Sequence, residues 1–471
     1  MVSGRSAQQV FAPLAKSRPV FKISEPIKVI HEPTDFYQTL LQGIKNARNR
    51  IFLSSLYLGS KEHELVGLLD KALVERPGLE VCVLLDCLRG TRVDSEGGSS
   101  AALLLPLVKK HGARVFLYHT PALHGVAKRL WPARYNETLG LQHIKAYVFD
   151  DEVVISGANL SRDYFTNRQD RYMLIRAKGV SDYFCGLIKT IGRFSFALSA
   201  ENALGGKAYG LQMSERAFPS PSKEPKEFVR QANALVSEFL RQAETENCTD
   251  ALSLSASDTM AVATVQMAQL GITQDSAHMA EFFRLTSLYA SAHGCRSLMA
   301  SAYFNFSDTH QSAVLHGQGR WDLLVSSPLA NGFHGASGIS GYIPDMYSLI
   351  EYEFLRSARK EGRKSLLAVE EYERSGWTFH GKGIWCYLDG RLPRLTMIGS
   401  PNYGYRSVFC DLEAQLTLVP GEQSSLTHDL HKEALGLLGY SQMVDEDILK
   451  KRTKDLPTWL RLLKPFIINK M

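Results

Sequence analysis

The chain has 471 residues, 45% of them hydrophobic and 22% charged, with a formal net charge of +6 and a pI near 8.8. This composition excludes a disordered chain and is sufficient for two domains with full cores. Seven cysteines without CxxC or zinc spacing argue against a disulfide framework, and the lack of an apolar run of about 18 residues argues against a spanning helix.

The first 24 residues are basic and contain no acid before Glu25. This pattern is compatible with a mitochondrial transit segment or its remainder, and equally with a loose terminus, so we expect 1–24 to lie outside the folded lobes.

Helices and strands alternate from there on. Helical periodicity begins at Thr34, and a second apolar stripe covers 65–73. Apolar runs predict strands at 51–58, 81–86, 114–118, 145–149, 153–156 and 172–175, and Ser181 begins a further helix. This alternation is typical of an α/β layer, and we assign 25–210 to a first lobe.

A segment rich in proline and serine follows near 219–225, and we interpret 211–270 as a linker with connecting helices. The order of the first lobe then begins again, because 296–304 lines up with 50–58. The sequence therefore predicts an α/β protein of two similar α/β/α lobes, the second spanning 271–471. We expect them to be related by a pseudo-twofold axis, with a site at their interface.

The strongest signal is a motif that occurs twice with its parts in the same order. The first copy is formed by His143, Lys145, Asp150, Asn159 and Asp170, and the second by His380, Lys382, Ser400, Asn402 and Glu413. The asparagine-to-acid interval is the same in both copies. One His-x-Lys pair arises easily by chance, but the repeated set does not. The second copy departs at Tyr387, which stands where the first has Asp150, and its nearest acid is Asp389.

These residues resemble the HKD signature of the phospholipase D superfamily, and the whole chain is most similar to the mitochondrial phosphatidylglycerophosphate synthase family. The resemblance implies transfer of a phosphatidyl group from CDP-diacylglycerol to glycerol 3-phosphate, a step toward phosphatidylglycerol and cardiolipin. It also implies a phosphatidyl-histidine intermediate, no cofactor, and a mitochondrial location, peripheral on the inner membrane. The family assigns the nucleophile to the first motif, here His143, and leaves His380 as general acid and base. The reverse assignment stays open.

The residue types suit this chemistry. Lys145 and Lys382 would hold the phosphoryl oxygens together with the amides of Asn159 and Asn402, so that no metal is required. Asp170 and Glu413 are expected to orient the histidines by accepting a hydrogen bond from the far ring nitrogen, as in the family. We include Asp150 because it belongs to the motif, but interpret it mainly as a turn former.

Two basic segments are candidates for binding the acceptor phosphate, although basic loops are more often only solvated. They contribute Arg89, Arg92, Lys128, Arg129 and Arg134. A basic and aromatic C-terminal stretch, 450–467, would contact an anionic membrane or else dock on its own core. We expect no nucleic-acid partner, and the sequence does not indicate an oligomeric state.

The rival functions share the same catalytic core. A phospholipase D-type phosphodiesterase or nuclease would pass the intermediate to water, and a CDP-diacylglycerol–serine phosphatidyltransferase would pass it to serine. A pseudoenzyme that only binds acidic lipids is disfavoured because both His/Lys/Asn sets are complete.

Overall fold

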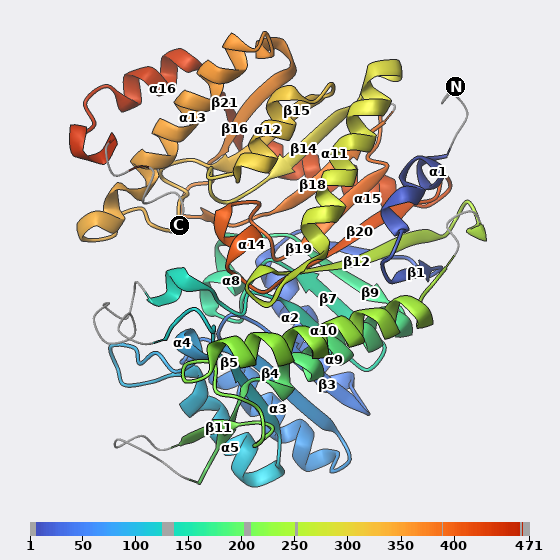
Figure 1. Cartoon of the computed structure of the whole chain (residues 1–471), viewed down its shortest axis with the longest axis vertical. Coiled ribbons are helices and arrows are strands. Elements are labelled where there is room, and N and C mark those ends of the chain that lie inside the picture. The colour runs from blue at the N-terminus through green and yellow to red at the C-terminus, as the bar shows by residue number, and fades with distance from the viewer. Residues whose placement is uncertain are drawn as a thin grey trace.

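Two large β-sheets, one in each lobe, organise the protein. The computed structural model describes residues 6–124, 136–201, 209–249, 253–388, 390–461 and 464. In Figure 1 the first lobe, blue to green, lies below the second lobe, yellow to red. The predicted two-lobe α/β architecture is confirmed. No disulfide joins the cysteines, all of which lie in the described ranges.

The sheet of the first lobe has the strand order β11-β10-β5-β4-β3-β6-β7-β9-β2. In chain order these strands are β2 (Lys28–Ile30), β3 (Arg50–Ser54), β4 (Glu80–Asp86), β5 (Arg114–Tyr118), β6 (Ala146–Phe149), β7 (Glu152–Ser156), β9 (Tyr172–Arg176), β10 (Phe196–Ser199) and β11 (Gly210–Met213). Strands β3, β4 and β5 are parallel and lie inside the sheet, which explains their nearly continuous apolar runs.

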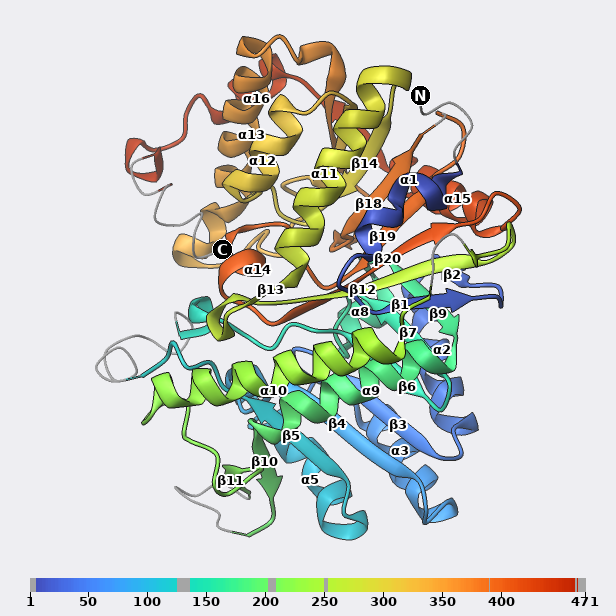
Figure 2. The ribbon, with the colours of Figure 1, turned by 45° about the vertical axis from the view of Figure 1, so that its right-hand side comes forward.

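Helices cover both faces of this sheet. They are α2 (Pro33–Asn46), α3 (His63–Glu75), α4 (Cys87–Gly90), α5 (Ser100–His111), η2 (Glu137–Leu139), α8 (Arg162–Thr166) and α9 (Lys178–Arg193). Helix α9 buries Val180, Phe184, Ile188 and Ile191 along one stripe, as its sequence periodicity requires. The long helix α10 (Pro225–Glu246) packs beside α9 (Figure 2).

The second sheet has the strand order β1-β12-β20-β19-β18-β14-β15-β16-β21. Its strands are β1 (Val20–Ile23), β12 (Thr259–Met267), β14 (Arg296–Ala300), β15 (Arg320–Ser326), β16 (Leu367–Tyr372), β18 (Gly383–Tyr387), β19 (Leu395–Gly399), β20 (Glu413–Pro420) and β21 (Ser441–Val444), with β13 (Ile272–Thr273) attached to β12. The run β16-β15-β14-β18-β19-β20-β12 repeats the order β5-β4-β3-β6-β7-β9-β2, so the repeat expected from 50–58 and 296–304 extends over most of each sheet.

The remaining elements complete the second lobe and join it to the first. Its helices are η4 (Ala268–Leu270), α11 (Gln274–His293), α12 (Asp308–His316), η5 (Gly338–Tyr342), α13 (Ile343–Lys360), η6 (Lys364–Leu366), α14 (Tyr405–Phe409), α15 (Leu426–Leu438) and α16 (Glu446–Thr453). A short parallel pair, β8 (Arg168–Gln169) with β17 (Thr378–Phe379), links the lobes. One apolar core contains Phe184 and Val236 beside Ala261 and Leu416, so it runs from the first lobe into the second.

The described part of the N-terminal segment corrects our expectation of a loose terminus. Helix α1 (Ala7–Phe11), η1 (Ala12–Ala15) and β1 belong to the second lobe, where β1 pairs antiparallel with β12. Phe11 and Leu14 are fully buried, and Phe11 stacks on Phe282 of α11. Figures 1 and 2 both show dark blue α1 and β1 beside the yellow-to-red second lobe, next to α11 and β12.

The predicted linker, 211–270, is also too long. Strand β11 extends the first sheet to Met213, and β12 already belongs to the second sheet from Thr259. The pattern of prolines near 219–225 marks the connection correctly but not its ends. Among the described residues, no helix combines the length and hydropathy needed to cross a membrane.

Candidate active site

The two motif histidines lie at equivalent places in the two lobes. His143 and Lys145 come directly before β6, whose hairpin partner β7 leads to Asn159. His380 and Lys382 come directly before β18, whose partner β19 leads to Asn402. The repeated strand order therefore delivers two similar sets of side chains to the interface between the lobes.

Each histidine is held by the acid of the other lobe. His143 Nδ1 lies 3.0 Å from both carboxylate oxygens of Glu413, and His380 Nδ1 lies 2.6 Å from Asp170 Oδ2. The backbone makes a similar contact between the lobes, because the His380 N–H donates to the Gln169 carbonyl at 2.7 Å. A carboxylate that accepts from Nδ1–H leaves Nε2 free to react, which is the orienting role expected for Asp170 and Glu413. The exchange between lobes was not predicted.

The two lysines lie among these groups. Lys145 Nζ donates to the His143 carbonyl at 2.7 Å, and Lys382 Nζ donates to the His380 carbonyl at the same distance. Lys382 Nζ also lies 3.4 Å from Asp170 Oδ2 and 2.8 Å from His380 Nδ1. Both lysines are almost fully buried, and burial lowers the pKa of Lys145 to about 7 and that of Lys382 below its ordinary value. An ammonium group at either position would act on a phosphoryl group with little screening by water.

Burial sets the protonation of the histidines. It lowers the pKa of His143 well below its ordinary value, and the charge of Lys145 lowers it further. Burial and then the charge of Lys382 lower the pKa of His380 to about 3, although Asp170 acts in the opposite direction. Both imidazoles are therefore neutral near pH 7, the form in which Nε2 can attack or accept a proton.

The two orienting acids differ electrostatically. Burial raises the pKa of Glu413 to about 7, despite the opposing charge of Lys145. Burial would also raise the pKa of Asp170, but Lys382 and His380 hold it below its ordinary value. Asp170 thus carries a full negative charge that would stabilise an imidazolium at His380. Glu413 carries a smaller average negative charge near pH 7, so it would stabilise an imidazolium at His143 less.

The motif asparagines and Ser400 have mainly structural partners. Asn159 Oδ1 accepts from the Leu56 N–H at 3.3 Å, and its Nδ2 donates to the Tyr164 hydroxyl at 3.1 Å. Ser400 Oγ accepts from the Ala414 N–H at 3.1 Å, which ties β19 to β20. Asn402 Oδ1 is buried without a hydrogen-bond partner among the described residues. Phosphate binding by these groups remains a prediction.

Asp150 lies at the far end of the hairpin and forms its turn. It has a left-handed φ of 51°, and its carboxylate accepts from the N–H groups of Arg48, Asn49 and Arg50 at 2.7, 2.8 and 3.0 Å. This agrees with the interpretation of Asp150 as a turn former and separates it from the two motif histidines, which lie at the other end of β6 and β18. Asp389 lies outside the described residues.

Arg89 and Arg92 share one acidic partner. Arg89 Nη1 lies 3.3 Å from Glu137 Oε2 and its guanidinium stacks on the Tyr57 ring, while Arg92 pairs with the same carboxylate. Their charges are thus partly balanced within the protein. Lys128, Arg129 and Arg134 lie outside the described residues, so an acceptor-binding role for these five side chains remains a prediction.

Two polar clusters around the site were not predicted. The Tyr164 hydroxyl lies 3.3 Å from His380 Nε2, and Arg168 stacks on the ring of Tyr164. Beside Asp170, Arg171 forms a two-pronged buried ion pair with Glu433 of α15, at 2.9 and 2.8 Å. Tyrosine and arginine are common throughout the chain, so the residue types alone do not mark a site. The only sequence signal for Tyr164 and Arg168 is their position between the motif residues Asn159 and Asp170.

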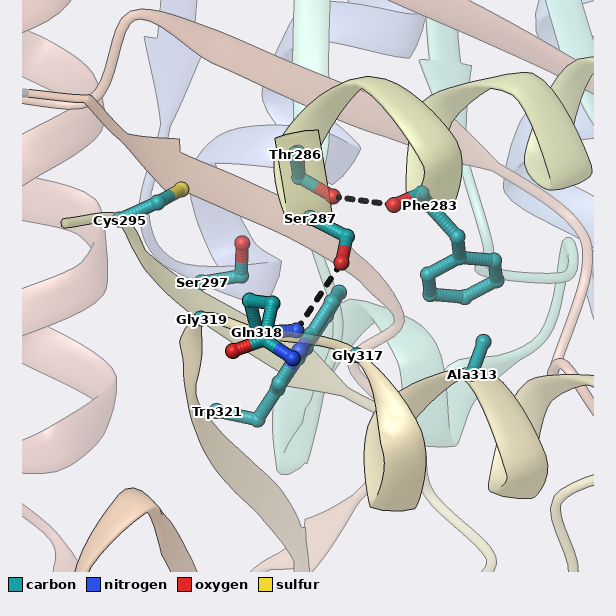
Figure 3. A pocket seen from close by; sticks show the side chains of 10 residues that line it. All are labelled: Phe283, Thr286, Ser287, Cys295, Ser297, Ala313, Gly317, Gln318, Gly319 and Trp321. Carbon is teal, nitrogen blue, oxygen red and sulfur yellow. Dashed lines mark hydrogen bonds between the residues drawn. The ribbon is translucent and has the colours of Figure 1, made fainter. Parts of the chain in front are cut away.

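A cavity in the second lobe is unrelated to this site. It lies between α11, α12 and the strands β14 and β15, as Figure 3 shows. Its lining residues are Phe283, Thr286, Ser287, Cys295, Ser297, Ala313, Gly317, Gln318, Gly319 and Trp321. With a volume of about 10 Å³ it has room for a single water molecule, so it carries no substrate.

Known proteins resemble this chain over most of its length. No family model matches the chain. The CDP-diacylglycerol–glycerol-3-phosphate 3-phosphatidyltransferase of Gallus gallus mitochondria is 36% identical, over 96% of this chain and 85% of that protein. The enzyme of the same name in Saccharomyces cerevisiae is 32% identical, over 95% of this chain and 88% of that protein. A probable member in Dictyostelium discoideum is 35% identical, over 95% and 78%.

The fold has a solved counterpart. The crystal structure of phosphatidylserine synthase from Haemophilus influenzae superposes with a TM-score of 0.70 at 17% identity, covering 99% of this chain and 98% of that one. At this identity the likeness concerns the fold alone, whereas the similarity to the phosphatidyltransferases extends along nearly the whole sequence. The chain therefore belongs to the family of CDP-diacylglycerol–glycerol-3-phosphate 3-phosphatidyltransferases.

Proposed function

We propose that this protein transfers a phosphatidyl group from CDP-diacylglycerol to sn-glycerol 3-phosphate and releases CMP. The observation that carries this proposal is the paired site, in which two neutral histidines, two buried lysines and two orienting acids come together from a chain of this family. Such a set supplies a nucleophile, a proton shuttle and positive charge for one phosphoryl group.

The reaction would proceed in two displacements. In the first, His143 Nε2 attacks the phosphatidyl phosphorus, and the bond to CMP breaks as CMP leaves with the bonding electrons. In the second, His380 Nε2 removes the proton from an acceptor hydroxyl, whose oxygen attacks phosphorus as the bond to His143 breaks. CMP is a good leaving group, so His380 matters most in the second displacement.

The electrostatics support this division of roles. The ionised Asp170 favours proton uptake by His380, as a general base requires. His143, with a more weakly charged Glu413 behind it and Lys145 beside it, resists protonation and so keeps its nucleophilic lone pair.

We place the protein at the mitochondrial inner membrane as a peripheral protein, by analogy with relatives whose names include the word mitochondrial. Part of the C-terminal stretch docks on the protein, since Leu460 is fully buried and Arg452 pairs with Glu371 of β16. Trp459, 39% exposed against the ring of Tyr342, is available for contact with lipid. Of the other apolar residues in that stretch, Leu456 and Leu460 are described, whereas Leu462, Leu463, Phe466 and Ile467 lie outside the described residues.

The activity is tested with CDP-diacylglycerol labelled in the phosphatidyl phosphate and offered glycerol 3-phosphate, serine or water as acceptor. We expect label in phosphatidylglycerophosphate. Label that enters only phosphatidate, or only phosphatidylserine, would instead identify a hydrolase or a serine phosphatidyltransferase.

The role assignment predicts that alanine variants of the two histidines are blocked at different steps of the reaction. His143→Ala forms no covalent adduct, so exchange of CMP into the donor vanishes. His380→Ala keeps the nucleophile but cannot deprotonate the acceptor, so one burst of CMP and a trapped phosphatidyl-enzyme are expected. Peptide mapping of the trapped label measures this. Label on the peptide that contains His380 would reverse the assignment.

A further inference from the structure

The two halves of the motif differ in one pair of charges. Four residues after its motif asparagine, the first lobe has Asp163, and nine residues after it has Arg168. At the same two positions the second lobe has Arg406 and Asp411. Both pairs meet in space, with Arg168 Nη2 3.3 Å from Asp163 Oδ2 and Arg406 Nη2 3.0 Å from Asp411 Oδ1. The ion pair is thus repeated with its charges exchanged.

The carboxylates of these pairs are buried to very different degrees. The Asp411 side chain is only 5% exposed and also accepts from the Leu141 N–H at 2.9 Å, so it neutralises Arg406 firmly. The Asp163 side chain is 62% exposed, where water and salt weaken an ion pair, so it neutralises Arg168 only weakly. Of the two arginines, Arg168 therefore has the charge that a ligand can use.

Arg168 is fixed close to the proposed general base. Its Nε donates to Thr378 Oγ1 at 3.0 Å, and its guanidinium lies over the ring of Tyr164, 4.9 Å from the centroid. The hydroxyl of that tyrosine is 3.3 Å from His380 Nε2. The charge of Arg168 also acts on both motif residues of that half-site, lowering the pKa of His380 and of Lys382 after the larger effect of burial. The Arg168 side chain is 20% exposed, so it can be reached from solvent.

We propose that Arg168 binds the phosphate of the acceptor, glycerol 3-phosphate, while His380 Nε2 takes the proton from its hydroxyl. This inference rests on the proposed function. The acceptor hydroxyl must lie at His380 Nε2, and the three-carbon chain then carries the phosphate away along the Tyr164 side toward Arg168. A guanidinium can donate two parallel hydrogen bonds to the oxygens of a phosphate. Serine and water have no such group, so Arg168 would distinguish glycerol 3-phosphate from both.

The test compares the full-length protein with its Arg168→Gln variant in two assays. The KM for glycerol 3-phosphate is expected to rise by about 10- to 100-fold, the loss typical of a hydrogen bond to a charged group. Exchange of labelled CMP into CDP-diacylglycerol, which needs only the donor, is expected to stay within about twofold. Arg162→Gln is the matched control, because Arg162 lies six residues earlier on the exposed side of α8 and loses the same charge.

Several outcomes would overturn the inference. One is an unchanged KM in Arg168→Gln, and another is a loss of CMP exchange as large as the loss of transfer. If Arg168→Gln lowers the unfolding temperature, Arg168→Lys is the deciding variant. Lysine keeps the positive charge but lacks the two parallel N–H donors of the guanidinium. It should raise the KM less than the glutamine variant while CMP exchange is retained. An unchanged KM in that variant as well would exclude phosphate recognition by the guanidinium fork. A wild-type protein that exchanges CMP but never uses glycerol 3-phosphate would refute the proposed function itself.

Discussion

Gly157 shows how tightly the motif side chains are packed. A Cβ at this position would lie 2.5 Å from Lys382 Nζ and 2.7 Å from Asp170 Oδ1, closer than van der Waals contact allows. We predict that Gly157→Ala displaces the ammonium group and lowers turnover by roughly 100-fold, the cost of a misplacement near 1 Å. Thermal unfolding measured in parallel should change little.

Gly67→Ala is the matched control, since nothing lies within 4 Å of a Cβ there and alanine suits the interior of α3 better than glycine. Normal turnover in Gly157→Ala would show that Lys382 does not need its present position for catalysis.

At the residue scale the sequence predicted the members of the site better than their partners. The repeated spacing identified His143, His380 and both lysines, because strand order forces equivalent positions to the same edge of each sheet. It could not assign Asp170 to His380, since the distance along the chain does not tell which lobe an acid faces. Arg168 was not predicted because it lies within the motif, whereas basic residues that could bind a phosphate were expected in loops outside it.

Among the elements, the N-terminal segment carries the clearest stability prediction. Phe11 and Leu14 are fully buried against the second lobe, and Phe11 stacks on Phe282. Phe11→Ala should destabilise the protein by about 3–5 kcal/mol through lost burial and the resulting cavity. Chemical denaturation measures this. Lys16→Ala, at an exposed position directly after η1, is the control, and an equal loss in both variants would contradict a packing role for Phe11.

The sequence predicted the long elements and missed the short ones for a physical reason. Periodicity over 14 or 16 residues, as in α2 and α9, is distinctive, and the apolar run of β4 is typical of a buried parallel strand. Helix α1 has five residues and β1 has four, too few to show a period. The basic residues between them suggested a targeting segment, whereas their stability comes from contacts with residues more than 200 positions away.

For the whole molecule, the exchange of acids between lobes makes a prediction that the sequence alone could not. Asp170 belongs to the first lobe but holds His380 of the second, so Asp170→Asn should fail in the manner of His380→Ala. We expect a burst of CMP, a trapped phosphatidyl-enzyme, and net transfer reduced by about 100-fold or more. Glu413→Gln should instead impair formation of the adduct, because Glu413 holds His143. Trapping with labelled donor measures both.

The opposite pattern would contradict the exchange if the trapped label maps to His143. If Asp170→Asn abolished the burst, Glu413→Gln preserved it and the label lay on the His143 peptide, each acid would serve the histidine of its own lobe, whereas label on the His380 peptide would reverse the roles of the histidines and keep the exchange.

The pairing of β1 with β12 also bears on how the chain is made. Strand β1 ends at Ile23, and its partner begins only at Thr259, so β1 leaves the ribosome long before the strand that will cover it. The whole first lobe is synthesised in that interval and can close over its own sheet, whereas Phe11 and Leu14 remain exposed. Until translation passes α11, which supplies Phe282, this apolar and basic segment is accessible to chaperones and to the machinery of protein translocation. The folding of the second lobe then withdraws it from both.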